Sequence, residues 1–137
     1  MVPALSLLGQ PGDLMSLENA DVLGPAPSWV TMDSVMLTNT SQWYFDVSTP
    51  QAPQRFYRAW QTGGPRVLPS LDLKRVPALT VTGSVGSSVR VDYINQFGPT
   101  DAWAALDTVT LASMSQLYFD VSAPGQPPRL YRLVQVP

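Results

Sequence analysis

The stretch Tyr-Phe-Asp-Val-Ser at residues 44–48 recurs unchanged at residues 118–122. The shift of 74 positions that relates the two also aligns residues 2–63 with residues 76–137 without a gap, and about 25 of the 62 aligned positions are identical. A gapless register of this kind identifies an internal repeat. We therefore predict a β repeat at 1–63, a linker at 64–75 that is partly a strand, and a second repeat at 76–137.

The repeat indicates strands and not helices. Apolar residues alternate with polar ones over short runs, as in Leu117, Phe119 and Val121, and glycine or proline bounds these runs. The predicted fold is all-β: two tandem copies of a small five-stranded antiparallel unit, sandwich-like and pseudo-symmetric. The expected strands are 3–9, 13–20, 29–38, 42–48 and 55–61, then 77–83, 87–94, 103–112, 116–122 and 129–136.

Two connections carry further expectations. The glycines at 9 and 12, repeated at 83 and 86, predict a hairpin between the first two strands of each copy. The proline-rich segments 50–53 and 124–128 predict crossings between the last two strands. A unit of about 62 residues is marginal as a free-standing core, so we expect the two copies to pack on each other.

Composition excludes several classes of protein. The chain is 45% hydrophobic and 13% charged, with a net charge of −2, no cysteine and no histidine. Thiol nucleophiles, zinc–thiolate sites and imidazole bases are therefore absent. Basic residues are few, so neither nucleic acid nor a membrane is an expected partner. The N-terminus lacks the positive charge of a signal peptide, so none is expected in this chain.

The order of motifs is distinctive. In copy one it runs from the acidic stretch 18–21 through Trp29 and Tyr44-Phe45-Asp46 to Arg-Phe-Tyr-Arg at 55–58. Copy two has the same order, with Leu130 in place of the phenylalanine. This pattern resembles a repeat of large secreted bacterial proteins, whose modules look like abbreviated fibronectin type III or immunoglobulin-like sandwiches. The resemblance implies an accessory module, extracellular or at the cell surface, within a larger protein.

The four tryptophans divide into two pairs. Trp29 and Trp103 occur in both copies, and we predict that they are core anchors, with sugar-stacking platforms as the alternative. Trp43 and Trp60 become leucine and valine in copy two, which favours packing positions. They are nevertheless the candidates for a binding face that only copy one has.

Asp46 and Asp120 each precede an Arg-x-Tyr-Arg strand. We predict that each carboxylate caps its turn or pairs with an arginine, which fixes the last two strands in register; a catalytic carboxylate is the alternative. A tyrosine of the same strand is expected to hydrogen-bond a loop at a corner of the sandwich. These partners are Arg55, Tyr57 and Arg58 in copy one, and Arg129, Tyr131 and Arg132 in copy two.

The remaining acids supply the only candidate metal ligands. Loop carboxylates suit calcium, so Asp13, Glu18, Asp21 and Asp92 form the candidate site, with scattered surface carboxylates as the default explanation. No cofactor is otherwise expected. The leading hypothesis is a non-catalytic binding or spacer module for a protein or a glycan. The alternative is a small carboxylate-dependent hydrolase, with or without calcium, whose site lies between the copies.

Overall fold

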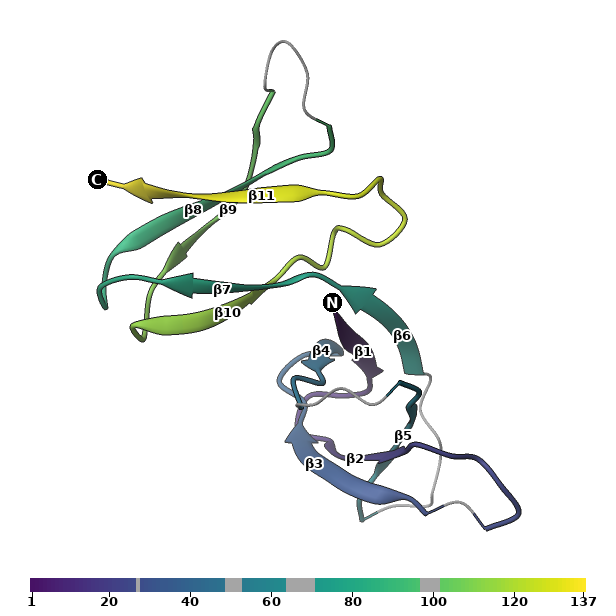
Figure 1. Cartoon of the computed structure of the whole chain (residues 1–137). Coiled ribbons are helices and arrows are strands. Elements are labelled where there is room, and N and C mark those ends of the chain that lie inside the picture. Colours follow the sequence, from purple (N-terminus) through teal and green to yellow (C-terminus); the bar gives the residue numbers. More distant parts are fainter. Residues whose placement is uncertain (27, 49–52, 64–70, 97–101) are drawn as a thin grey trace. The chain divides into compact units, whose positions relative to one another are not determined.

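The structure is a computed structural model that describes residues 1–26, 28–48, 53–63, 71–96 and 102–137. Within these residues the prediction of an all-β chain is confirmed: eleven strands form four small antiparallel sheets, and no helix is present (Figure 1). The described residues accordingly offer no helix able to cross a membrane. The chain divides into two compact units, which we call the N-terminal unit (Val2–Lys74) and the C-terminal unit (Arg75–Pro137, with Met1).

Two three-stranded sheets make up the N-terminal unit. One has the order β4-β1-β6 and the other has the order β3-β2-β5, so β1 and β2 are the two central strands. The strand β6 falls in the segment 64–75 that was predicted to be partly a strand, and it extends across the boundary between the units. The bounds are β1 (Val2–Leu8), β2 (Leu14–Ala20), β3 (Val30–Met36), β4 (Ser41–Phe45), β5 (Phe56–Gln61) and β6 (Leu71–Val76).

The central strands supply most of the core of this unit. Leu5 and Leu7 of β1 and Met15 and Leu17 of β2 are almost completely buried. Full burial of one such side chain contributes roughly 1.5–3 kcal/mol relative to exposure. Leu37 and Ala59 complete the buried cluster, and partly buried residues from β3, β4, β5 and β6 pack against it. Both sheets therefore contribute side chains to one core.

The C-terminal unit has a two-stranded sheet, β10-β7, and a three-stranded sheet, β11-β8-β9 (Figure 1). Its core cluster is smaller: Val81, Val89 and Leu111, with Tyr118 packed against it. The bounds are β7 (Ala78–Thr82), β8 (Ser88–Ile94), β9 (Ala104–Thr110), β10 (Ser115–Phe119) and β11 (Leu130–Val136).

Strand registers in the two units differ by a constant 74 residues. Leu5 pairs with Tyr44 in the N-terminal unit, and Leu79 pairs with Tyr118 in the C-terminal unit. The pairing of β2 with β3 shifts register after Leu17, and the pairing of β8 with β9 shifts after Val91. The 74-residue offset of the sequence repeat thus also relates the strand pairings of the two units.

The expected hairpin between the first two strands is wrong. β1 pairs with β4 and β6, whereas β2 pairs with β3 and β5, so the turn at residues 9–13 carries the chain from one sheet to the other. Gly12 N–H donates to the carbonyl of Leu37 at 2.7 Å, and Leu37 N–H donates to the carbonyl of Asp13 at 2.8 Å. A glycine-rich turn fits either connection, and the central position of both strands decides between them.

The strand expected at 42–48 ends at Phe45, and the one expected at 116–122 ends at Phe119. In both places the following aspartate accepts a hydrogen bond from the backbone N–H two residues later, at 3.0 Å. A side chain that bonds its own backbone in this way makes a turn and competes with the strand ladder. The alternation of apolar residues through Val47 and Val121 therefore extends past the strand itself.

Gly12 allows a direct test of this turn. Its φ is +94°, in the left-handed region, and a Cβ there would meet no atom within 4 Å. We expect Gly12→Ala to lower the free energy of unfolding by about 1 kcal/mol through backbone conformation alone. Gly24→Ala is the matched control, because Gly24 is equally open and its φ is not positive. Urea denaturation of both variants measures the difference; equal values would contradict the explanation.

Candidate functional site

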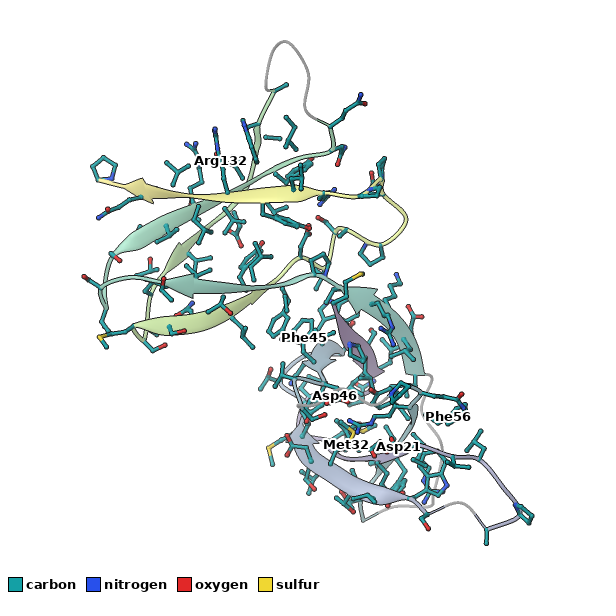
Figure 2. The ribbon with its side chains drawn as sticks, in the orientation of Figure 1. Asp21, Met32, Phe45, Asp46, Phe56 and Arg132 are labelled. Carbon is teal, nitrogen blue, oxygen red and sulfur yellow. The ribbon has the colours of Figure 1, made fainter. Side chains whose placement is uncertain are left out.

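A buried aspartate lies at the centre of the N-terminal unit. Asp46 follows β4 and is 2% exposed. Its Oδ1 accepts from the backbone N–H of Ser48 at 3.0 Å and from the Ser48 hydroxyl. Its Oδ2 accepts from the Tyr57 hydroxyl at 2.8 Å and from Nη1 of Arg55 at 3.0 Å. The carboxylate therefore joins the turn after β4 to Tyr57 of β5 and to Arg55 directly before that strand. Figure 2 labels Asp46 in this unit.

The C-terminal unit contains the corresponding centre. Asp120 is 1% exposed and accepts from the backbone N–H of Ser122 at 3.0 Å and from the Ser122 hydroxyl at 2.6 Å. Its Oδ2 accepts from the Tyr131 hydroxyl at 2.7 Å and from Nη1 of Arg129 at 2.8 Å. Every donor stands 74 positions after its counterpart. We call the two groups the Asp46 centre and the Asp120 centre.

These hydrogen bonds decide the charge of each centre. Burial alone would raise the pKa of Asp46, but hydrogen bonds from Ser48, Tyr57 and Arg55 outweigh it, and the pKa of this carboxyl group is lowered. The pKa of Asp120 is lowered in the same way. Burial and the adjacent Asp120 raise the pKa of the Tyr131 hydroxyl. Each centre is thus an ionised carboxylate held by a serine, a tyrosine hydroxyl and an arginine guanidinium.

Each Arg-x-Tyr-Arg stretch has two arginines, and it is the first, Arg55 or Arg129, that donates to the aspartate. Nε of Arg58 instead donates to Oε2 of Glu18 at 2.6 Å, and its guanidinium lies 4.3 Å from the ring centroid of Trp29 and 5.1 Å from that of Trp60. Neighbouring residues on a strand point to opposite faces, as do residues at odd separations generally. Arg55 and Arg58 are three residues apart, so they serve different faces of the unit.

The same arrangement recurs around Arg132, which Figure 2 labels in the C-terminal unit. Its Nε donates to Asp92 at 2.9 Å, and its guanidinium lies 4.5 Å from the ring centroid of Trp103. The role of Trp29 and Trp103 as core anchors stays a prediction. Both rings are half-buried, belong to neither core cluster, and precede their strands as partners of an arginine. Cation–π pairing explains a repeated tryptophan as well as core packing does.

Asp92 has two cationic partners. Arg90 donates through Nε at 2.7 Å and through Nη2 at 3.0 Å, in addition to the bond from Arg132. The hydrogen bond from Arg90 lowers the pKa of Asp92 most, burial opposes it, Arg132 adds to the lowering, and the resulting pKa is about 2. Position 16, the counterpart of Arg90, is a serine. The C-terminal unit therefore has a fork of two arginines where the N-terminal unit has one ion pair.

These lowered pKa values predict a loss of stability in acid. A carboxyl group with a lower pKa in the folded state contributes stability that is complete above its unfolded pKa and is lost as the pH falls through its folded pKa. For Asp92 this window extends from the ordinary value of 3.8 down to about 2. We expect the free energy of unfolding, measured in urea, to fall steadily between about pH 4 and pH 2.

Asp92→Asn is the diagnostic variant for this pH dependence, because the amide cannot titrate. We expect a smaller fall below pH 4 than in the unchanged protein. Asp72→Asn is the control, since Asp72 is exposed and its contact with Lys74 is a 3.7 Å surface pair. Parallel curves for Asp92→Asn and the unchanged protein would contradict the assignment.

The candidate calcium ligands lie apart in the described residues. Asp13 accepts from the backbone N–H of Gln10 at 2.8 Å and from the side chain of Gln61 at 3.0 Å. Asp21 pairs with Nε of Arg55 at 3.1 Å, while Glu18 and Asp92 pair with arginines as described above. Among the described residues no three acidic side chains gather into a group able to hold a metal ion.

Trp43 and Trp60, the candidate binding pair, differ in their surroundings. Trp43 lies on β4, is exposed, and stacks on Phe45 with ring centroids 6.3 Å apart. Trp60 lies on β5, is half-buried, and is next to Arg58.

Sequence reasoning missed two residues at these centres. Ser48 and Ser122 belong to the repeated stretch, but no role was predicted for them. Each hydroxyl donates to the aspartate of its unit. Each also accepts from Nη1 of the first arginine, at 2.7 Å from Arg55 and at 2.8 Å from Arg129. The identity of the serine in both copies was the available signal.

No protein-family model, curated protein or solved structure matches this chain.

Proposed function

We propose that the chain is a non-catalytic binding or spacer module of a larger extracellular protein, with a protein or a glycan as its partner. In this proposal residues 1–63 and 76–137 are two copies of one five-stranded antiparallel β-sandwich, similar to fibronectin type III modules, and residues 64–75 connect them. The proposed function is supported by the hydrogen bonds of the buried aspartates. The proposed architecture is supported by the constant offset in residue number between the strand pairings of the two units.

The observation that carries the proposal is the use of the buried carboxylates. Asp46 and Asp120 are the two acids for which a catalytic role was the alternative, and both are buried and ionised. Both oxygens of each carboxylate are already bonded by a serine, a tyrosine and an arginine of the same unit. A general base or nucleophile must reach substrate, and a carboxylate engaged on all sides instead fixes a turn against a strand. Both centres therefore favour a structural role.

The offset supports two equivalent units. The strand pairings, the register shift and the hydrogen bonds of the two centres all recur at a separation of 74 residues. Side chains from both sheets enter one core in the N-terminal unit, as a sandwich requires. Repetition of a structural unit with few chemical groups suits a module that spaces or binds, because each copy presents similar surfaces.

A hydrolysis assay tests this function against the carboxylate-dependent alternative. Purified protein is incubated with chromogenic glycoside, ester and peptide substrates, with chelator and then with added calcium. We expect no rate above the blank in any condition. A chelator-sensitive rate that returns with calcium and disappears in Glu18→Gln, Asp21→Asn or Asp92→Asn would overturn the proposal, since these are the acids such chemistry would need.

A further inference from the structure

The two units differ at one position next to the repeated centres. Tyr93 of β8 pairs with Tyr131 of β11, and at the same place in the N-terminal unit Asn19 of β2 pairs with Tyr57 of β5. The ring of Tyr93 lies against the first arginine of its unit, with the Arg129 guanidinium carbon 4.0 Å from the ring centroid. An asparagine has no ring to place there, so the corresponding face of Arg55 is not covered in this way.

A cavity of about 490 Å³ lies at this place in the N-terminal unit. Its polar wall includes Asn19, Asp46, Ser48 and Arg55, and its apolar wall comes from Val30, Met32, Tyr44 and Val47. Figure 2 labels Met32 of β3 and Asp46, which directly follows β4, and both residues line this cavity. The side chain of Arg55 is 16% exposed, whereas that of Arg129 is 7% exposed. The difference is the one expected if a ring covers only the second arginine.

From this comparison we infer that the cavity beside Arg55 binds an aromatic side chain of a partner protein, in the place that Tyr93 fills within the C-terminal unit. This inference rests on the proposed binding function and names a site and a ligand class for it. The C-terminal unit then serves as the reference for the bound state of the N-terminal unit. In it the Tyr93 ring already lies against the guanidinium of Arg129, which pairs with Asp120.

The chemistry of the cavity favours a tyrosine. A guanidinium over an aromatic face gains a cation–π attraction of about 0.5–2 kcal/mol, depending on how far the pair is desolvated. Val30, Met32 and Val47 offer apolar contact to the ring, and methionine sulfur makes favourable contacts with aromatic edges. The Asn19 amide both donates and accepts hydrogen bonds, so it suits a phenolic hydroxyl. A tyrosine side chain thus matches both walls.

Asp21 holds Arg55 ready for such a ring. Its carboxylate accepts from Nε of Arg55 at 3.1 Å, while Nη1 is held by Asp46 and Ser48. These three contacts lie at the edge of the planar guanidinium group and leave its faces for stacking. In the C-terminal unit, position 95 is an asparagine, and Nε of Arg129 has no hydrogen-bond partner among the described residues. One unit fixes its arginine with a second acid, and the other covers it with a ring.

The test is a titration of the whole chain with N-acetyl-L-tyrosinamide, followed by the Arg55 Nε–H and Asn19 side-chain signals in ¹H–¹⁵N spectra. A single ring in an open cavity should bind with a dissociation constant on the order of millimolar. We expect ring-current shifts at these two groups, and none with N-acetyl-L-leucinamide or with methyl β-glucoside. Equal shifts with the leucine compound or the sugar would overturn the aromatic assignment, and no shift with any of the three would overturn the site.

A variant that fills the cavity gives a second test with the same probe. Asn19→Tyr places a ring where Tyr93 stands in the other unit, and we expect it to weaken binding of the probe at least tenfold while the spectrum of the folded unit is retained. Asn39→Tyr, on an exposed turn, is the matched control and should bind as the unchanged protein does. Equal binding by Asn19→Tyr and the unchanged protein would contradict the inference. That result would leave the absence of hydrolysis, and with it the proposed function, untouched.

Discussion

We expect Asp120→Ala to lower the free energy of unfolding of the C-terminal unit by about 3–5 kcal/mol, the cost of breaking a buried ion pair by removing one partner. The aspartate is 1% exposed, and its loss leaves the buried Arg129 guanidinium without its counter-ion and the Tyr131 hydroxyl without its acceptor. A small domain has only about 0.05–0.15 kcal/mol of stability per residue. The expected loss is therefore a large share of the whole stability of a unit of this size.

The same substitution in the other unit should be milder. Arg55 keeps Asp21 as a second carboxylate when Asp46 is removed, and its side chain is more exposed than that of Arg129. We therefore expect Asp46→Ala to cost about 1–3 kcal/mol, closer to the cost of leaving polar groups unpaired. The order of the two losses is the specific expectation, because the hydrogen bonds described above for the two centres correspond one to one.

Amide hydrogen exchange measures each unit separately, since a single melting temperature is poorly defined for a chain with two units. Asp72→Ala serves as the control, because exposed surface pairs contribute about 0–1 kcal/mol. A larger loss for Asp46→Ala than for Asp120→Ala would contradict the role given to Asp21. Unchanged protection together with a lost activity would make the aspartate a catalytic residue.

The repeat made much of the fold predictable from the sequence. A gapless shift locates equivalent strands, and alternation of side chains shows which residues of a strand share a face. The expectation that Asp46 lies close to an arginine also followed from the sequence, because the stretch at 44–48 and the strand that begins at Arg55 are repeated together. The sequence left open which arginine this is. In the structure Arg55 donates to the carboxylate, whereas Arg58 donates to Glu18.

The expected hairpin and the role of the repeated tryptophan were hard to predict for one physical reason. Whether the turn at residues 9–13 closes a hairpin depends on which edges of β1 and β2 are already paired, and local sequence does not contain that information. Residue type likewise does not show whether a tryptophan such as Trp29 packs in the core or only lies against a guanidinium from a distant strand, as it does beside Arg58. Pairings between strands that are far apart in the sequence decide both questions, and residue type constrains them weakly.

Comparison within the chain recovers part of that information. Position 16 is serine and position 90 is arginine, so Asp92 gains a second cation that Glu18 lacks. Position 19 is asparagine and position 93 is tyrosine, so one centre adjoins a cavity and the other a ring. These substitutions change the surroundings of a centre and leave its hydrogen bonds alone. Two units with one scaffold can therefore differ in what they bind.

The second large effect concerns the apolar core. Leu17 is completely buried on β2, the central strand of its sheet, and belongs to the cluster that side chains from both sheets of the N-terminal unit share. We expect Leu17→Ala to lower the free energy of unfolding of this unit by about 2–5 kcal/mol, through lost transfer free energy and the cavity left behind. Its counterpart Val91 has a smaller side chain, so Val91→Ala should cost less in the C-terminal unit.

Leu23→Ala is the matched control for this prediction. It removes the same atoms from a loop residue that is 52% exposed, and exposed substitutions usually change stability by less than about 0.5 kcal/mol. Hydrogen exchange of β2 amides and urea denaturation measure all three variants. If Leu17→Ala and Leu23→Ala lost equal stability, side chains from the two sheets would not form one core. The sandwich proposed for the N-terminal unit would then lose its main support, because the shared core is the apolar contact between the sheet β4-β1-β6 and the sheet β3-β2-β5.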